Sequence, residues 1–286
     1  MSGPARASRR WGRGVAAAAA AACAGSLAAP LPAQTISPEP DRPLRVCLLE
    51  HDLPRADRAS QSGFDLELMR ALAERLDRRL ELVWRPSAPS FSEIEDSELP
   101  LGPLAAGDCD LTPSVPGRAA LGDLAGRLEL TRPYYGAAFE LAARDSGPAP
   151  RTFDQLAGET VAVQLQTLAQ FAVHRRGFRW LAAPTTREVL ALFESGEATT
   201  ALVWGPALAR AGVAASAAWQ PPPFLRWNEH LAVRRQEAAL LAQVDGALGE
   251  LLAEGVVAAL AERYGILRQP FDEVFDPSTW NAALEH

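Results

Sequence analysis

The chain has 286 residues, enough for one large domain or two of ordinary size, and its 48% hydrophobic and 22% charged residues exclude a disordered or fibrous protein. The formal net charge is -7, and beyond residue 33 there are 24 arginines against 35 acidic residues, a balance of -11. Such an acidic chain is not expected to bind nucleic acid or an anionic membrane surface. Every Lys or Arg position is arginine, which we interpret as a bias of genome composition. An arginine at a given position is therefore weak evidence of a functional role.

The N-terminal segment has the pattern of a secretory signal peptide. Four arginines lie between residues 6 and 13, an apolar run follows over 15–23, and small residues follow at 26–29. The run is too short for a membrane span, so we expect cleavage after Ala28 or Ala33 and export to the periplasm. A twin-arginine signal at residues 8–10 and lipoprotein attachment at Cys23 remain open alternatives. Residues 34–43 contain three prolines and are interpreted as a linker.

The first half of the folded part predicts a strand, a helix and a second strand in succession. These are residues 44–49, 64–79 and 80–84, which form a βαβ unit with parallel strands and a right-handed crossover. Residues 85–103 are rich in proline and acidic side chains, without a clear period. Further strands are predicted at 110–115 and 139–144, before a strong break at 145–148.

The second half repeats the α/β pattern on a smaller scale. The predicted strands are 160–164, 201–204 and 231–234, and the predicted helices are 166–176, 187–195 and 237–264, the last with a break near 254–255. The pattern therefore predicts an α/β protein of two lobes joined by two strand crossings. In such folds ligands bind at the carboxyl ends of strands or between lobes.

The order of several short motifs resembles the bacterial extracellular solute-binding proteins of the periplasmic type II class, family 3. The motifs are Gly63-Phe64-Asp65 at a helix start, Gly107-Asp108-Cys109-Asp110, Thr131-Arg132-Pro133-Tyr134-Tyr135, and Phe153 to Gly158 before the next strand. The resemblance implies a two-lobe fold with an interlobe cleft. Lobe 1 would span 44–143, lobe 2 144–230, and 231–286 would return to lobe 1. The lobes would close about strands 139–144 and 231–234.

A narrower resemblance links the chain to accessory proteins encoded beside quinoprotein alcohol dehydrogenases, the methanol dehydrogenase J-protein group. Val203-Trp204-Gly205-Pro206 carries most of it. It implies a quinoprotein dehydrogenase subunit or a c-type cytochrome as partner, in methanol oxidation. Trp204 stands where amino-acid binders of this fold usually have an aspartate for the ligand ammonium, and Arg55 replaces their stacking aromatic residue.

Two cysteines, Cys47 and Cys109, remain after signal cleavage. In an exported chain they are either a disulfide or two small buried hydrophobic side chains. The resemblance implies that the first and third strands of lobe 1 are neighbours, which would bring the two cysteines within disulfide distance. We therefore predict a Cys47–Cys109 disulfide.

The sequence contains no recognisable catalytic or metal-binding motif, so we expect a binding protein without cofactor or metal that acts as a monomer. His51 lies beside Glu50 and Asp52. These residues have two interpretations, a metal or acid/base site or a solvated loop. Arg118 could bind a carboxylate, and Gln166 and Thr167 offer amides at a helix start to anionic groups. The residues expected to line the cleft are His51, Asp52, Ser114, Arg118, Tyr135, Gln166, Thr167 and Trp204.

These features favour an accessory role for a quinoprotein dehydrogenase. The alternative is the solute-binding component of an ABC importer, which would bind a small polar or anionic solute and contact an ABC permease.

Overall fold

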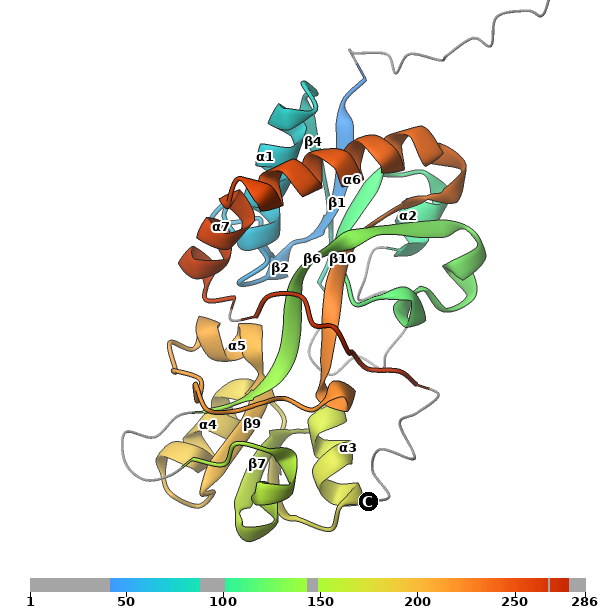
Figure 1. The fold of residues 1–286 in the computed structure, drawn as a ribbon. Helices are drawn as coiled ribbons and strands as arrows, with labels where there is room; N and C mark the ends of the chain where they lie inside the picture. The colour runs from blue at the N-terminus through green and yellow to red at the C-terminus, as the bar shows by residue number, and fades with distance from the viewer. Residues whose placement is uncertain (1–41, 88–100, 143–148, 267, 278–286) are drawn as a thin grey trace, which may run out of the picture. The chain divides into compact units, whose positions relative to one another are not determined.

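A computed structural model describes residues 42–87, 101–142, 149–266 and 268–277 (Figure 1). The predicted signal peptide, most of the linker and the acidic run at 93–98 lie outside these residues. The strands are β1 (Leu44–Leu49), β2 (His51–Asp52), β3 (Ala56–Asp57), β4 (Leu80–Arg85), β5 (Leu111–Val115), β6 (Leu128–Leu141), β7 (Thr160–Gln164), β8 (Arg179–Ala183), β9 (Thr200–Trp204) and β10 (Arg226–Arg234).

The described helices cover both halves of the chain. They are α1 (Phe64–Arg75), α2 (Leu101–Ala106), α3 (Leu168–Arg175), α4 (Thr186–Glu194), α5 (Gly205–Arg210), α6 (Ala238–Ala253) and α7 (Val256–Tyr264). Four 3₁₀ helices join them: η1 (Arg118–Gly126), η2 (Phe153–Gly158), η3 (Pro223–Leu225) and η4 (Arg235–Glu237).

Eight strands form one sheet in the order β4-β1-β5-β10-β6-β9-β7-β8. β1 pairs in parallel with β4 and β5, which confirms the predicted βαβ unit. β7 pairs in parallel with β8 and β9, and β10 is antiparallel to both β5 and β6. We call the part built on β4, β1 and β5 lobe 1 and the part built on β9, β7 and β8 lobe 2, with β6 and β10 between them.

Strand β1 separates two cores of lobe 1 because alternate side chains point to opposite faces of a sheet. Leu44, Val46 and Leu48 are buried in a cluster with residues of α1, α6 and α7. Cys47 belongs to a second cluster, together with Leu104 of α2. The sheet of lobe 1 is thus covered on both faces, as parallel strands require.

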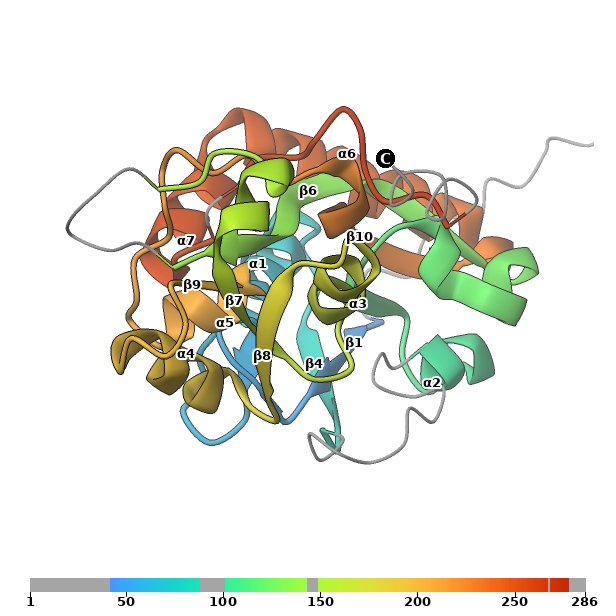
Figure 2. The same ribbon diagram turned by 90° about the horizontal axis from the view of Figure 1, so that it is seen from below.

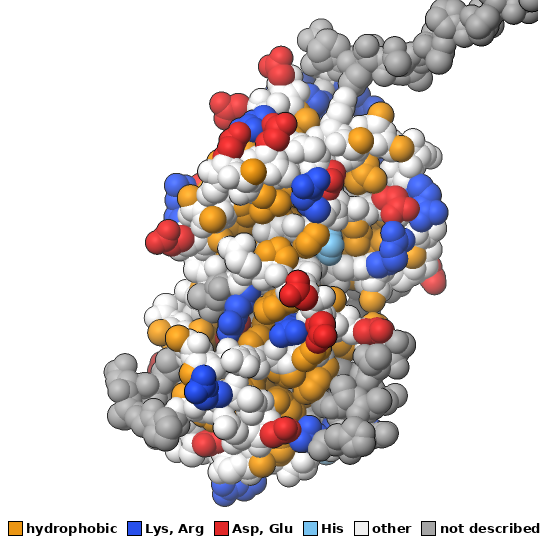
Figure 3. All heavy atoms as spheres, in the orientation of Figure 1, with side chains coloured by type: hydrophobic (Ala, Val, Ile, Leu, Met, Phe, Trp, Pro, Cys, Tyr) orange, Lys and Arg blue, Asp and Glu red, His pale blue; other side chains and the backbone are white. Residues whose placement is uncertain are grey.

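The same alternation organises lobe 2. Val161 and Val163 of β7 pack in a cluster with α3, whereas Ala162 between them packs in a cluster with α4. Figure 2 shows α3 and α4 on opposite sides of β7 and β8. The face of the molecule seen in Figure 3 carries acidic and basic side chains interspersed with apolar ones.

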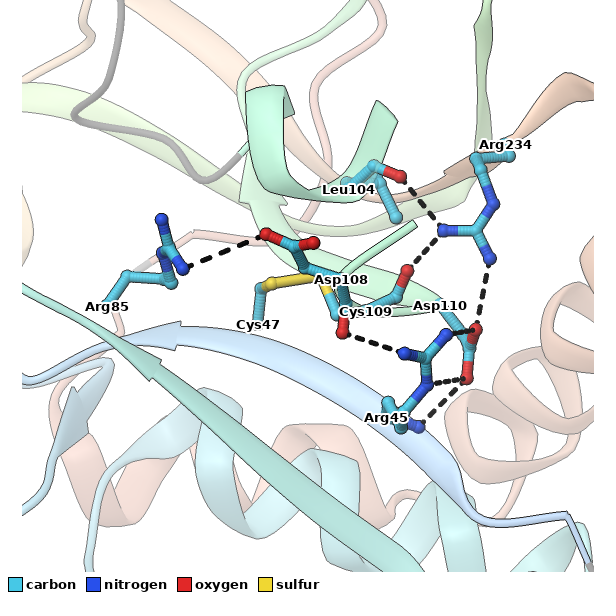
Figure 4. Close-up of a disulfide and its surroundings, with 8 residues drawn as sticks. All are labelled: Arg45, Cys47, Arg85, Leu104, Asp108, Cys109, Asp110 and Arg234. Carbon is cyan, nitrogen blue, oxygen red and sulfur yellow. Dashed lines mark hydrogen bonds and ion pairs between the residues drawn. A yellow bond between two sulfur atoms is a disulfide. The ribbon is translucent and has the colours of Figure 1, made fainter. Parts of the chain in front are cut away.

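The predicted disulfide is confirmed. Cys47 and Cys109 are bonded, with a Cα–Cα distance of 5.7 Å, and they join β1 to the segment two residues before β5 (Figure 4). Next to it, the buried carboxylate of Asp110 accepts hydrogen bonds from Arg45 at 2.8 Å and Arg234 at 3.0 Å. Burial opposes ionisation of Asp110, but these bonds outweigh it and hold its pKa below the ordinary value.

The connection between the lobes is longer than predicted. β6 begins at Leu128 and β10 at Arg226, whereas the sequence predicted strands only at 139–144 and 231–234. The early part of β10 contains Arg226, Asn228 and His230, whose polar side chains conceal the strand pattern. The register pairs Arg226 with Ala138, so these early residues of β10 form the crossing.

A C-terminal segment, residues 268–277, runs across β6 and β10 (Figure 1, dark red). The Asn228 side chain donates to the carbonyl of Phe271 at 2.9 Å and accepts from its N–H at 2.7 Å. Arg268 binds the buried carboxylate of Glu140 through two bonds of 2.8 Å. Gly136 allows this approach, since a Cβ there would lie 2.3 Å from the carbonyl oxygen of Gln269.

Other differences from the predicted elements are local. Helix α1 ends at Arg75 rather than at residue 79, and β8 and α5 were not predicted. The break between α6 and α7 falls at residues 254–255, as predicted, where Gly255 adopts a left-handed φ of 78°. None of the helices in the described part combines the length and apolar character needed to cross a bilayer.

Candidate functional site

A cavity of about 350 Å³ is lined by residues of both lobes and of β10, a volume suited to a small molecule. Its lining residues are Leu49, His51, Asp52, Arg55, Ser87, Ser114, Pro116, Trp204, Trp227 and Glu229. Two other hollows, of about 440 and 460 Å³, are lined by residues 182–197 and by residues between 152 and 226. The 350 Å³ cavity is the better candidate because buried charged groups and aromatic side chains converge on it.

The segment between β1 and α1 supplies an ion pair to the cavity. Arg55 Nε lies 2.8 Å from Asp52 Oδ2, and its Nη2 donates to Asp52 Oδ1 at 2.9 Å. This paired geometry fixes the guanidinium plane. The segment ends at Gly63, whose backbone (φ 136°) packs against that of Arg55. Only glycine permits this approach, because a Cβ at residue 63 would lie 2.4 Å from the Arg55 carbonyl oxygen. The tight loop therefore holds the ion pair against the helix start.

A hydrogen-bonded network lies behind Ser114. The Ser114 hydroxyl donates to Asp65 Oδ2 at 2.6 Å, and the Tyr134 hydroxyl donates to Asp65 Oδ1 at 2.7 Å. The Ser114 N–H donates to the same tyrosine hydroxyl at 3.0 Å. Burial raises the pKa of Asp65 to about 6 against the effect of these bonds. The network fixes Ser114, which has a positive φ of 56°.

Two tryptophans form the aromatic wall of the cavity. The rings of Trp204 and Trp227 stack with centroids 4.5 Å apart and an interplanar angle of 9°. Phe139 packs about 6 Å from both, at 6.1 and 6.0 Å. Trp204 ends β9, and Trp227 lies on β10, so the stack joins lobe 2 to the crossing strand. Such rigid aromatic surfaces favour flat, apolar or cationic ligand groups.

Glu229 brings a buried carboxyl group to the same cavity. Its side chain is 1% exposed, and Oε1 accepts a hydrogen bond from Trp227 Nε1 at 3.0 Å. Oε2 is buried and has no hydrogen-bond partner among the described residues. Burial raises the pKa of Glu229 to about 7, although the charge of Arg55 acts in the opposite direction.

Four of the eight predicted site residues line the cavity: His51, Asp52, Ser114 and Trp204. The ring of His51 also contacts Asp57, with Nδ1 3.0 Å from the carboxylate. Tyr135 is buried just behind Ser114, and the two hydroxyl oxygens lie 3.2 Å apart. Neither Tyr135 nor its neighbour Tyr134 lines the cavity, and both pack in the core of lobe 1.

The remaining three predicted site residues are not among those that line this cavity. Arg118 is exposed in η1 and pairs with Glu129 at 2.8 Å. Thr167 caps α3, where its hydroxyl accepts from the N–H of Gln170, and the N–H of Gln166 donates to the Gln170 side chain at 2.6 Å. In the described part of the chain no group of three or more His, Cys, Asp or Glu is arranged to hold a metal ion.

Sequence reasoning missed Arg55, Trp227 and Glu229 as lining residues. Arg55 was noted only because it replaces the aromatic residue that stacks on ligands in amino-acid binders of this fold. Trp227, Glu229 and Leu231 alternate with polar residues, a period of two that extends the strand before residue 231 and would place both side chains on one face. An acid within that alternation was the signal for a buried carboxyl group.

The α/β fold of two lobes matches that of periplasmic solute-binding proteins of known structure. The unliganded, open L-cystine solute receptor of Neisseria gonorrhoeae aligns with a TM-score of 0.65 and 18% identity, over 80% of this chain and 94% of that one. An ancestral cationic amino acid solute-binding protein aligns with a TM-score of 0.60 and 23% identity, over 78% and 95%. The second substrate-binding domain of a putative amino acid ABC transporter from Streptococcus pneumoniae aligns with a TM-score of 0.62 and 17% identity, over 77% and 99%.

At these identities the similarity establishes the fold alone. No protein-family model matches the chain, and no curated protein matches it in sequence. The chain is therefore similar to amino-acid solute-binding proteins in architecture, and its function is argued from the cavity.

Proposed function

We propose that this protein is an exported solute-binding protein that captures a small polar solute in its 350 Å³ cavity and delivers it to an ABC permease. The main observation behind this proposal is the cavity, which is lined by residues of both lobes and of β10, a strand that connects them. In a fold with two crossing strands, a ligand that contacts both sides stabilises a closed arrangement of the lobes. The protein would act by binding, as a monomer, without catalysis.

The three similar structures support this proposal by their descriptions: two are amino-acid solute-binding proteins or receptors, and one is a domain of an amino acid ABC transporter. Export is supported by the N-terminal sequence pattern and by the Cys47–Cys109 bond, because disulfides persist in oxidising compartments.

The proposed domain boundaries are those expected from the sequence: lobe 1 spans 44–143, lobe 2 spans 144–230, and residues 231–286 return to lobe 1.

The accessory role beside a quinoprotein dehydrogenase is the second candidate. Trp204 favours it: the indole lies on the cavity wall, stacked on Trp227, where the amino-acid binders of the resemblance place an aspartate. None of the three similar structures is described as such an accessory protein. A dehydrogenase subunit or c-type cytochrome as partner therefore stays a prediction from the sequence.

Calorimetric titration of the mature protein tests the solute-binding proposal. The protein is unfolded, dialysed and refolded with its disulfide intact, then titrated with a panel of amino acids, amines, carboxylates and sugars. We expect at least one solute to bind, with an affinity that falls about 10-fold or more in Trp204→Ala, since that ring forms the cavity wall. Trp180→Ala, which removes a tryptophan of β8 away from the cavity, should leave the affinity unchanged. A folded protein that binds no member of the panel would contradict the proposal.

A further inference from the structure

The charged groups of the cavity are paired, with one exception. Asp52 neutralises Arg55, and His51 contacts Asp57. Glu229 has no ion-pair partner within the described residues, and its Oε2 has no hydrogen-bond partner there. A buried carboxylate without a partner is unfavourable, so the side chain either takes up a proton or binds a cation or a hydrogen-bond donor.

The surroundings of Glu229 direct this choice toward a cation. The titratable and charged groups near it come from β2, the following loop, α1 and β6; they are Asp52, Arg55, Asp65, Tyr134 and Tyr135. Arg55 is the single cation of this set and it is already held by Asp52. The remaining charge in the cavity is therefore negative when Glu229 is ionised, and the indole rings of Trp204 and Trp227 add a surface that attracts cations.

We infer that Glu229 selects solutes that carry a cationic nitrogen, an ammonium or guanidinium group, by binding that group with its carboxylate beside Trp227. This inference rests on the proposed solute-binding function and specifies the class of solute. It differs from the polar or anionic solute that the sequence predicted. The residues expected to hold an anion, Arg118, Gln166 and Thr167, bind Glu129 or cap α3 instead.

Binding of such a solute depends on pH because it requires the ionised form of Glu229. With the pKa near 7, this side chain is largely ionised at pH 8 and about 1% ionised at pH 5. The affinity for a cation therefore falls by about 100-fold between these values, while the charge of an aliphatic amine stays constant. Glu229 thus couples solute release to acidification.

The test compares probes that carry a cationic nitrogen with neutral probes of similar shape. Titration calorimetry uses 1-aminobutane against 1-butanol, and 1,4-diaminobutane against 1,4-butanediol, at pH 8 and pH 5. We expect a cationic probe to bind at least 10-fold more tightly than its neutral counterpart at pH 8 and to lose about 100-fold in affinity at pH 5.

Glu229→Gln keeps the size and the acceptor for Trp227 but removes the charge. This variant should lose about 100-fold in affinity for the cationic probe at pH 8, lose the preference over the neutral probe, and show no change with pH. Asp65 also titrates near this range, and it is retained in Glu229→Gln, so a flat pH profile assigns the effect to Glu229. Glu262→Gln, on the exposed side of α7, is the matched control and should behave as the wild type.

The outcomes separate this inference from the proposed function. If a neutral or anionic solute binds as tightly as the cationic probes, or if Glu229→Gln keeps the wild-type preference, the inference is wrong and solute binding stands. If neither these probes nor the wider panel binds, both fall. Should Glu229→Gln fail to fold by circular dichroism, the wild-type comparison of charged and neutral probes at the two pH values decides alone.

Discussion

At the scale of single residues, the hydroxyl of Tyr134 connects two buried groups of lobe 1 by hydrogen bonds. It accepts from the N–H of Ser114 and donates to Asp65, and all three residues are at most 4% exposed. Removing this one oxygen leaves a backbone donor and a carboxylate oxygen without that partner. Groups buried in this way cost more than the hydrogen bond itself contributes.

Tyr134→Phe should therefore lower the free energy of unfolding by about 2 kcal/mol. Tyr135→Phe is its natural control, because within the described residues that hydroxyl lies at hydrogen-bond distance only from the Ser114 side chain, at 3.2 Å, and Ser114 keeps its bond to Asp65. We expect a loss of less than about 1 kcal/mol there. Urea denaturation of the two variants measures the difference, and equal losses would show that the Tyr134 network is not a stabilising feature.

The residues of the cavity were predictable where they follow a strand. His51, Asp52, Ser114 and Trp204 lie at or near carboxyl ends of strands, where α/β folds gather functional side chains, and the structure places all four at the cavity. Glu229 was not predicted because the alternation of Trp227, Glu229 and Leu231 was not recognised as part of a strand, and its place at the cavity also depends on the pairing of β10 with β6. Arg118 was a plausible carboxylate ligand by residue type, but its neighbour Glu129 is adjacent only in the folded chain.

At the scale of elements, the C-terminal segment 268–277 fastens the crossing strands. Arg268 forms two bonds to Glu140, whose side chain is 1% exposed, and donates a third to the carbonyl of Trp219 at 2.9 Å. Since Glu140 belongs to β6 and Trp219 is buried in a core cluster of lobe 2, one side chain connects three segments of the chain. A buried carboxylate that loses the cation paired with it is strongly unfavourable.

Arg268→Met should lower the free energy of unfolding by about 3 kcal/mol, because it leaves the Glu140 carboxylate buried without its cation. The exposed pair Arg118–Glu129 provides the comparison, and Arg118→Met should cost less than about 1 kcal/mol. Both values come from urea denaturation curves. A loss in Arg268→Met no greater than in Arg118→Met would mean that the segment does not depend on this ion pair.

The elements that the sequence predicted best are those with regular apolar spacing. Strand β1, strand β9 and the break between α6 and α7 were all located within one or two residues. The long strands β6 and β10 were underestimated because the missed part of β6 contains Pro133 and the missed part of β10 contains several polar residues. These parts are stabilised by pairing between the two strands rather than by local propensity. The disulfide was predictable only once a strand order was available.

At the scale of the whole molecule, the fold determines which charged groups meet in the cavity. Two α/β lobes share one sheet, and β10, one of the two strands between them, carries Trp227 and Glu229 to the cavity. A solute held by Glu229 and by the loop that carries Asp52 and Arg55 would contact both the crossing strand and lobe 1. The proposed capture of a solute therefore rests on a buried acid, an aromatic pair and a fixed ion pair in one cavity.

The most direct measurement is the native mass spectrum of the protein purified from the organism that makes it. We expect an added small mass, bound one to one, that is lost on denaturation and is absent from Trp204→Ala produced in the same way. A chain that carries no small mass but retains a stoichiometric quinoprotein dehydrogenase or cytochrome subunit would contradict solute capture and establish the accessory role.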